Sequence, residues 1–142
     1  MYLIVILPIA SAILAQIIKQ FTGGDRFKAR GFLSYSGMPS GHSAIVISLA
    51  TIIGLQQGLS SPAFAISLVL ALIIITDAIG LRSYLGEHGK ILNVLVKDLR
   101  EDKLLDAKYP KLLERIGHTP IQAIFGSLLG FVVSLAGYIL FS

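Results

Sequence analysis

Residues 31–76 read GFLSYSGMPSGHSAIVISLATIIGLQQGLSSPAFAISLVLALIIIT, and none of them is Asp, Glu, Lys or Arg. This run is too long for one membrane-spanning helix, which needs about 20 residues. It contains one strong turn signal, Gly58-Leu59-Ser60-Ser61-Pro62. We therefore expect two membrane-spanning helices, over residues 41–57 and 62–80, joined by a tight hairpin.

The rest of the chain extends this pattern to four membrane-spanning helices. Of its 142 residues, 54% are hydrophobic and 14% are charged, whereas a soluble domain carries about 25% charged residues. Two further apolar runs predict spans over residues 2–18 and 119–141. We expect an all-α, polytopic membrane helix bundle that forms a single domain over residues 1–142. The absence of cysteine excludes disulfides, thiol nucleophiles and cysteine-based metal sites.

The charged residues fall into two islands. Lys19–Arg30 has a net charge of +3 and Asp77–Arg115 a net charge of +1. With four spans both islands lie on one side of the membrane, and basic loops stay in the cytoplasm. We expect an integral, multi-pass protein of the cell membrane with both termini outside. The alternative is a cleaved signal peptide ending near Ala10-Ser11-Ala12, although a signal peptide normally begins with a basic region.

The second island contains an amphipathic segment over residues 87–115. Ile91, Leu92, Leu95 and Leu99 recur at helical spacing among charged residues. We expect one or two helices that lie at the membrane interface or cap the bundle on its cytoplasmic side. The alternative is a solvated connector with a structural apolar face.

Two histidines stand at the starts of predicted spans. His42 follows Gly41 at the second span, and His118 follows Gly117 at the fourth. Helix N-termini present free N–H groups and a partial positive charge, which favour phosphate. Together with nearby cations, one histidine as nucleophile and one as acid are sufficient for phosphoryl transfer. No Asp, Glu or His cluster has metal-ligand spacing, so we expect no metal and no other cofactor.

The motifs around these histidines resemble a known family over essentially the whole chain. The matching strings are Gly37-Met38-Pro39-Ser40-Gly41-His42-Ser43-Ala44, Asp77-Ala78-x-Gly80-x-Arg82, and Gly117-His118-Thr119-Pro120-x-Gln122 with Gly126. They are similar to the divergent branch of the type 2 phosphatidic acid phosphatase and vanadium haloperoxidase superfamily. The resemblance implies that Ser40 and Gly41 bind phosphate and that His42 protonates the leaving group. It also implies phosphate binding by Lys19 and Arg26, although Phe27 stands where the family has proline.

The third family motif, which provides the nucleophile, can be matched in two ways. In the first, the motif is split by an insertion, so that Arg82 binds phosphate and His118 is the nucleophile. In the second, His88 is the nucleophile at the family spacing from Arg82, but Leu92 then occupies the position of the orienting aspartate. In the split reading Gln122 replaces that aspartate.

The amide of Gln122 can accept a hydrogen bond from the His118 ring but supplies no charge. Asp77 either supplies that charge from the neighbouring helix or pairs with Arg82.

The resemblance implies a metal-independent lipid phosphatase that hydrolyses a phosphate monoester or diphosphate through a phosphohistidine. Phosphatidate, phosphatidylglycerophosphate and polyprenyl phosphates are the expected types of substrate. The alternative is a non-catalytic protein that binds, flips or scaffolds lipid phosphates. Haloperoxidase activity with bound vanadate is disfavoured because the site opens to lipid.

The expected partners are a lipid phosphate and membrane lipids, without nucleic acid. A stripe of small residues in the last span is suited to close helix packing, either within the chain or in a homo-oligomer. The stripe consists of Gly126, Gly130, Ser134 and Gly137.

Overall fold

The computed structural model describes residues 2–22, 38–101, 112, 114 and 117–141, and within them the chain forms five α-helices and no strand. They are α1 (Leu3–Thr22), α2 (Gly41–Gln57), α3 (Pro62–Ile79), α4 (Leu81–Glu101) and α5 (Pro120–Phe141). The all-helical fold class is thereby confirmed. Three of the predicted spans agree with α2, α3 and α5 to within one residue. α1 continues to Thr22, four residues beyond the predicted end, and Lys19 is buried in the bundle.

Side-chain caps fix the hairpin between α2 and α3. Ser61 accepts a hydrogen bond from the Phe64 amide at 3.2 Å and donates one to the Gly58 carbonyl at 2.8 Å. Pro62 occupies the first turn of α3, where its missing N–H costs nothing. Gly58 ends α2 with φ +85°, a conformation that favours glycine. The predicted turn at residues 58–62 therefore forms from local chemistry.

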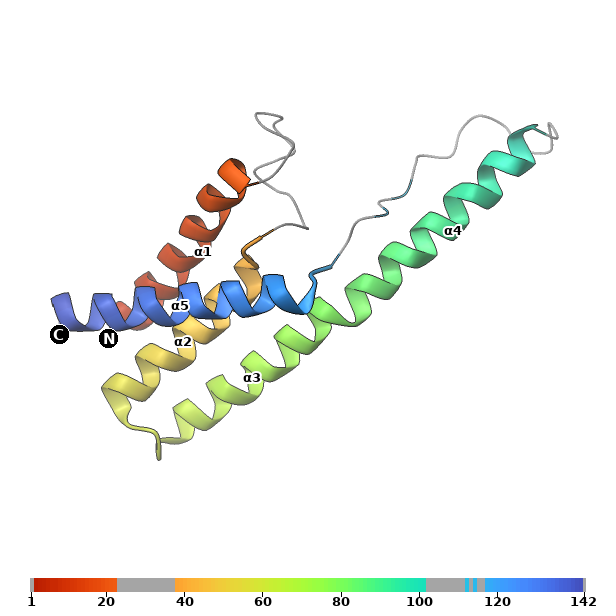
Figure 1. The fold of residues 1–142 in the computed structure, drawn as a ribbon. Coiled ribbons are helices and arrows are strands. Elements are labelled where there is room, and N and C mark those ends of the chain that lie inside the picture. The colour runs from red at the N-terminus through yellow and green to blue at the C-terminus, as the bar shows by residue number, and fades with distance from the viewer. Residues whose placement is uncertain (1, 23–37, 102–111, 113, 115–116, 142) are drawn as a thin grey trace.

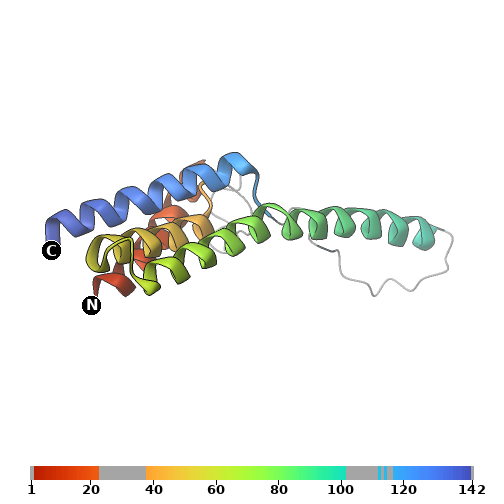
Figure 2. The same cartoon turned by 90° about the horizontal axis from the view of Figure 1, so that it is seen from below.

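α2 is the central helix of the bundle and packs against α1, α3 and α5 (Figures 1 and 2). α5 approaches α2 closely through its small residues, because a Cβ atom at Gly126 or Gly130 would overlap the carbonyl oxygen of Ser40 or Ala44. One turn further along, the Ser48 and Ser134 hydroxyls form a 2.6 Å hydrogen bond. The small-residue stripe of α5 is thus buried within the chain, which is the first of the two predicted alternatives.

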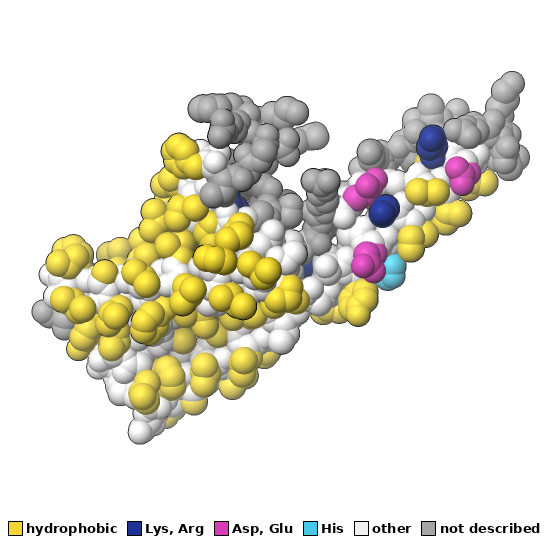
Figure 3. Space-filling model, in the orientation of Figure 1, with side chains coloured by type: hydrophobic (Ala, Val, Ile, Leu, Met, Phe, Trp, Pro, Cys, Tyr) yellow, Lys and Arg dark blue, Asp and Glu magenta, His cyan; other side chains and the backbone are white. Residues whose placement is uncertain are grey.

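The surface of the bundle suits a lipid environment. α1, α3 and α5 are long and apolar enough to cross a membrane. α2 has 17 residues and, at 1.5 Å per residue, is about 26 Å long, close to the hydrocarbon thickness of a bilayer. Hydrophobic side chains cover much of the visible face of the bundle, whereas most of the charged side chains visible in this view lie along α4 (Figure 3). This distribution is expected of a multi-pass membrane protein.

The two termini lie together at one end of the bundle (Figures 1 and 2). The opposite end, here called the charged end, is formed by the end of α1, the start of α2, the end of α3 and the start of α5. Both charged islands are attached to it, as a four-span arrangement predicts. The candidate functional residues therefore meet at one end of the bundle.

α4 follows α3 after Gly80, continues it nearly in line and projects beyond the bundle (Figures 1 and 2). It begins at Leu81, six residues before the predicted insertion, and residues 102–111 of that insertion lie outside the described residues. Within the described part of the chain, α4 packs along α3, and its first residues also approach His42 of α2 and Gly117. Its Asn93 side chain bonds the backbone N–H and carbonyl of Leu112, each at 2.9 Å. α4 thus extends from the bundle instead of capping it.

Candidate active site

The start of α2 provides the first part of the site. Ser40 is fully buried and caps the helix, since its Oγ accepts from the Ser43 amide at 3.3 Å. The Ser43 hydroxyl also donates to Ser40 Oγ, at 3.1 Å. The Ser40 amide donates to the Gln122 carbonyl at 3.0 Å, which ties the start of α2 to the first turn of α5. Gly41 begins the helix, so its amide belongs to the group of N-terminal donors without helical partners.

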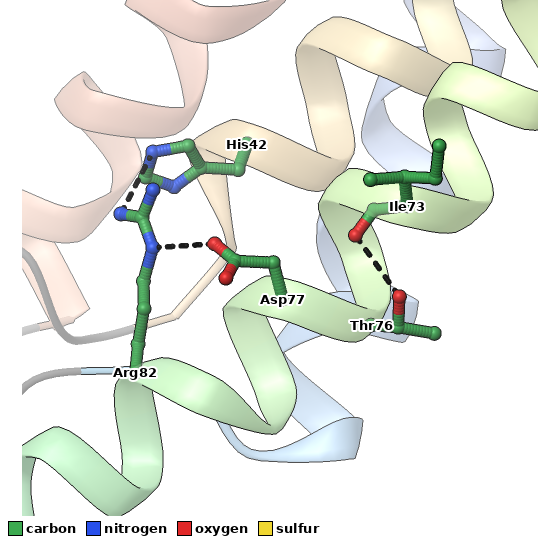
Figure 4. A network of polar contacts seen from close by, with 5 residues as sticks. All are labelled: His42, Ile73, Thr76, Asp77 and Arg82. Atoms are coloured by element: carbon green, nitrogen blue, oxygen red, sulfur yellow. Dashed lines mark hydrogen bonds and ion pairs between the residues drawn. The ribbon is translucent and has the colours of Figure 1, made fainter.

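His42, in the first turn of α2, contacts a guanidinium that is itself held by a carboxylate (Figure 4). Arg82 Nη1 lies 3.3 Å from His42 Nε2, and Arg82 Nε donates to Asp77 Oδ2 at 3.1 Å. A guanidinium only donates, so His42 Nε2 is the acceptor here and Nδ1 bears the ring proton. Of the two predicted roles for Asp77, the geometry shows the pairing with Arg82.

His118 lies two residues before the start of α5 and is positioned by Gln122 in the first turn of that helix and by α3. Gln122 and Thr119 cap the start of α5 reciprocally. The backbone N–H of Thr119 donates to the side-chain Oε1 of Gln122 at 3.0 Å, and the backbone N–H of Gln122 donates to Oγ1 of Thr119 at 3.3 Å. The His118 amide donates to the Ala78 carbonyl at 2.9 Å. Gly117 has φ +109°, and a Cβ there would lie 2.8 Å from the Ser83 amide nitrogen. Only glycine lets the chain pass so close to the start of α4.

The ring of His118 has a defined tautomer. Its Nδ1 lies 3.3 Å from Gln122 Oε1, and because an amide oxygen only accepts, Nδ1 bears the proton. Its Nε2 is buried and has no hydrogen-bond partner among the described residues. Burial lowers the pKa of His118 to about 4, and the charge of Lys19 contributes to that direction. At neutral pH, Nε2 is therefore a buried nitrogen with a free lone pair.

α1 contributes a buried cation. Lys19 is only 7% exposed and forms no ion pair with a carboxylate among the described residues. One turn earlier, Gln16 Oε1 is also buried and unpartnered among those residues. A Cβ atom at Gly41 would lie 3.8 Å from Gln16 Nε2, which places this amide beside the start of α2.

Sequence reasoning missed Gln16. The available signal was its position three residues before Lys19, on the same helical face of an otherwise largely apolar run.

The fold brings together residues from all five helices and their junctions. The rings of His42 and His118 have centroids 5.9 Å apart and planes inclined at 56°. Around them lie Lys19, the Arg82–Asp77 pair, Gln122 and the start of α2. His88 is exposed on α4, six residues beyond Arg82 or about 9 Å along the helix axis. Arg26 lies outside the described residues. Among the described residues, no group of three or more His, Cys, Asp or Glu side chains could hold a metal ion.

Comparisons with known proteins agree with the resemblance of the motifs. The model of the Divergent PAP2 family matches residues 2–133. The chain is also 37% identical over 139 residues to "Uncharacterized membrane protein YuiD" of Bacillus subtilis (strain 168), which covers 89% of this chain and 88% of that protein. No solved structure matches the chain. The chain is a multi-pass membrane protein and belongs to the Divergent PAP2 family.

Proposed function

We propose that this protein is a lipid phosphate phosphatase that acts without a metal ion, with His118 as nucleophile. The observation that supports the proposal best is the buried Nε2 of His118, which has no hydrogen-bond partner among the described residues. It lies near Lys19, a buried cation that has no counter-ion among the same residues. A buried polar atom without a partner and a buried cation without a counter-ion are both costly. A phosphate group reduces both costs, because it places a phosphorus atom against the lone pair and negative oxygens against the cation.

The first chemical step forms a bond between His118 Nε2 and phosphorus and breaks the bond from phosphorus to the lipid oxygen. The leaving oxygen keeps the electron pair and takes a proton from His42. His42 Nε2 accepts from Arg82 in the arrangement described above, so we propose that the phosphate draws the Arg82 guanidinium toward its oxygens. The His42 ring is then free to take up a proton and deliver it.

The second step returns the site to the state with a protonated His42 from which the first step began; the proton that His42 took up from water before the first step is released to water when the phosphate leaves and Arg82 bonds the ring again. Water adds to phosphorus, the N–P bond breaks, and the proton of the water passes to His42, so that the net reaction is hydrolysis of the ester or anhydride. Lys19, Arg82 and the first amides of α2, including that of Gly41, balance the charge on the equatorial oxygens. Gln122 keeps the His118 ring in the tautomer that presents Nε2. Asp77 positions Arg82 and does not touch the phosphorus.

The position of the site at the charged end of the bundle supports a substrate whose phosphate lies at the membrane surface. We propose that this surface is the cytoplasmic side of the cell membrane, because both charged islands are attached to that end and their sum is positive.

The test is phosphate release by the purified protein in the presence of a chelator. The substrates are phosphatidate, phosphatidylglycerophosphate and a polyprenyl phosphate. We expect turnover of at least one of them, inhibition by vanadate, and loss of activity in His118→Ala and His42→Ala. His88→Ala is the matched control, because His88 is exposed and away from the two paired rings, and it should retain most of the activity. Alkaline quenching and peptide mapping should place a labelled phosphate on the peptide that contains His118. A label on His88 would show that the unsplit motif is the functional one.

A second function is favoured by one residue. Gln122 presents a neutral amide to His118 where a carboxylate would stabilise an imidazolium by charge. A protein of this kind can bind, flip or scaffold a lipid phosphate without hydrolysing it. Saturable binding of phosphatidate by folded protein that releases no phosphate from any substrate would support this function and exclude the first.

A further inference from the structure

An apolar groove runs along the bundle beside the candidate active site. It has a volume of about 370 Å³, within the range of small-molecule sites. Its walls come from α1, from the two residues before Ser40, and from α5. The residues that line it include Ile18, Pro39, Phe125, Leu128 and Val132. All of these side chains are apolar, so the groove suits hydrocarbon and offers nothing to a polar ligand.

Each wall of the groove is one residue away from a residue that belongs to the site or packs against it. Ile18 precedes Lys19 in α1, and Pro39 precedes Ser40 at the cap of α2. Phe125 precedes Gly126, whose backbone packs against Ser40. Successive residues of a helix point about 100° apart. The groove and the site are therefore neighbouring surfaces around one junction of α1, α2 and α5.

The groove is open along one side. Phe125, Leu128 and Val132 are 48%, 54% and 58% exposed, and they lie in a membrane-spanning helix. In a bilayer this exposed surface faces lipid tails, so a hydrocarbon chain can enter from the side. The transfer of the chain from the bilayer to the groove provides no hydrophobic driving force. The chain is stabilised there by close packing, and its binding positions the phosphate in the site. Interactions of this kind with a remote part of the substrate can raise the rate at the reacting end.

We propose that this groove binds the hydrocarbon chain of the lipid phosphate whose phosphate group occupies the site. This inference rests on the proposed function for the identity of the headgroup. The occupant is a single acyl or isoprenoid chain that runs along α5 from Phe125 toward Val132. The substrate class is thereby a membrane lipid with its chain held by the protein, as opposed to a soluble phosphate ester.

The first measurement compares a long-chain phosphatidate with its six-carbon-chain analogue as substrates. Leu128→Trp places a larger side chain in the groove, at a position that is already partly exposed to lipid. We expect the ratio of kcat/KM for the long-chain substrate to that for the six-carbon-chain substrate to fall at least tenfold. Ile124→Trp is the matched control on the same helix, because Ile124 is 58% exposed and does not line the groove. It should change the ratio by less than twofold. An unchanged ratio in Leu128→Trp would overturn the proposal.

The second measurement does not depend on turnover. A long-chain alkyl phosphate with a diazirine near the middle of the chain is photolysed with the full-length protein, and the same chain ending in an alcohol serves as reference. We expect labelling of the peptide around residues 125–132 that depends on the phosphate and falls in Leu128→Trp. Equal labelling by the alcohol, or labelling spread over α3, would refute a chain site even if the enzyme is active. If labelling depends on the phosphate but the protein releases no phosphate, the groove binds the hydrocarbon chain and the proposed phosphatase function is refuted.

Discussion

The close contact of α5 with α2 at Gly130 gives a prediction for stability. A Cβ atom at Gly130 would overlap the carbonyl oxygen of Ala44 and lie 2.9 Å from its carbonyl carbon and 3.0 Å from its Cα. Carbon atoms in good contact are about 3.5–4.0 Å apart. Gly130→Ala therefore forces α2 and α5 apart by about 0.5–1 Å. Overpacking of this kind costs about 1–3 kcal/mol.

The free energy of unfolding of Gly130→Ala should fall by that amount, measured by denaturation in detergent with circular dichroism. Gly137→Ala is the matched control in the same helix. Its Cβ would meet the side-chain methyl groups of Leu7, which can rotate, instead of rigid backbone. We expect a smaller loss in Gly137→Ala. If Gly130→Ala is as stable as the wild type, or if the two variants lose the same stability, the close packing of α5 on α2 is not what the contacts imply.

Three further predictions concern the site and its orientation. The pKa of His118 is about 4 in the folded protein against 6.5 for an ordinary histidine, so between these values the unfolded state binds more protons. The free energy of unfolding should fall as the pH falls from 6.5 to 4, with a weaker slope in His118→Asn. Gln122→Leu removes the acceptor for both the His118 ring and the Thr119 amide. This substitution should lower the turnover and reduce the free energy of unfolding by about 1 kcal/mol. Gln122→Glu should preserve both hydrogen bonds. Equal losses of turnover and stability in the two variants would argue against the role of Gln122 as acceptor. A cysteine at Ser60 should be labelled by an impermeant reagent from outside the cell and one at Lys103 should not, and the reverse pattern would place the site on the outer side.

Local chemistry explains why much of the fold could be predicted. The starts of α2 and α3 depend on Ser40 and Ser61 as caps and on Pro62, all of which are visible in the sequence. The sequence predicts the first span to end at residue 18, before the first charged residue, whereas α1 continues to Thr22. Lys19 is instead buried among the helices, and this follows from packing that a single sequence does not display.

In the candidate site, too, some features are predicted by local sequence and others depend on packing between helices. The split match of the third motif predicts His42, His118 and Gln122 in one site, and the structure brings these three residues together. The pairing of Asp77 with Arg82, and of Arg82 with His42, depends on how α3, α4 and α2 are rotated about their axes. Gln16 and the apolar groove depend on the same rotations. These angles are set by contacts such as that of Gly126 with Ser40, which join residues far apart in the chain.

The polar groups inside the bundle separate into two classes, and the division supports the proposed site. Away from the charged end, Ser11 donates to backbone carbonyls of Pro8 and Ala44, and Ser48 bonds Ser134. Such groups must find partners within the protein because lipid offers none. At the charged end, Gln16 Oε1 and His118 Nε2 are buried without partners among the described residues, and Lys19 has no counter-ion there. Their partner must therefore come from outside the described part of the chain. The nearby cations favour an anion, and the adjoining apolar groove favours one attached to a hydrocarbon chain.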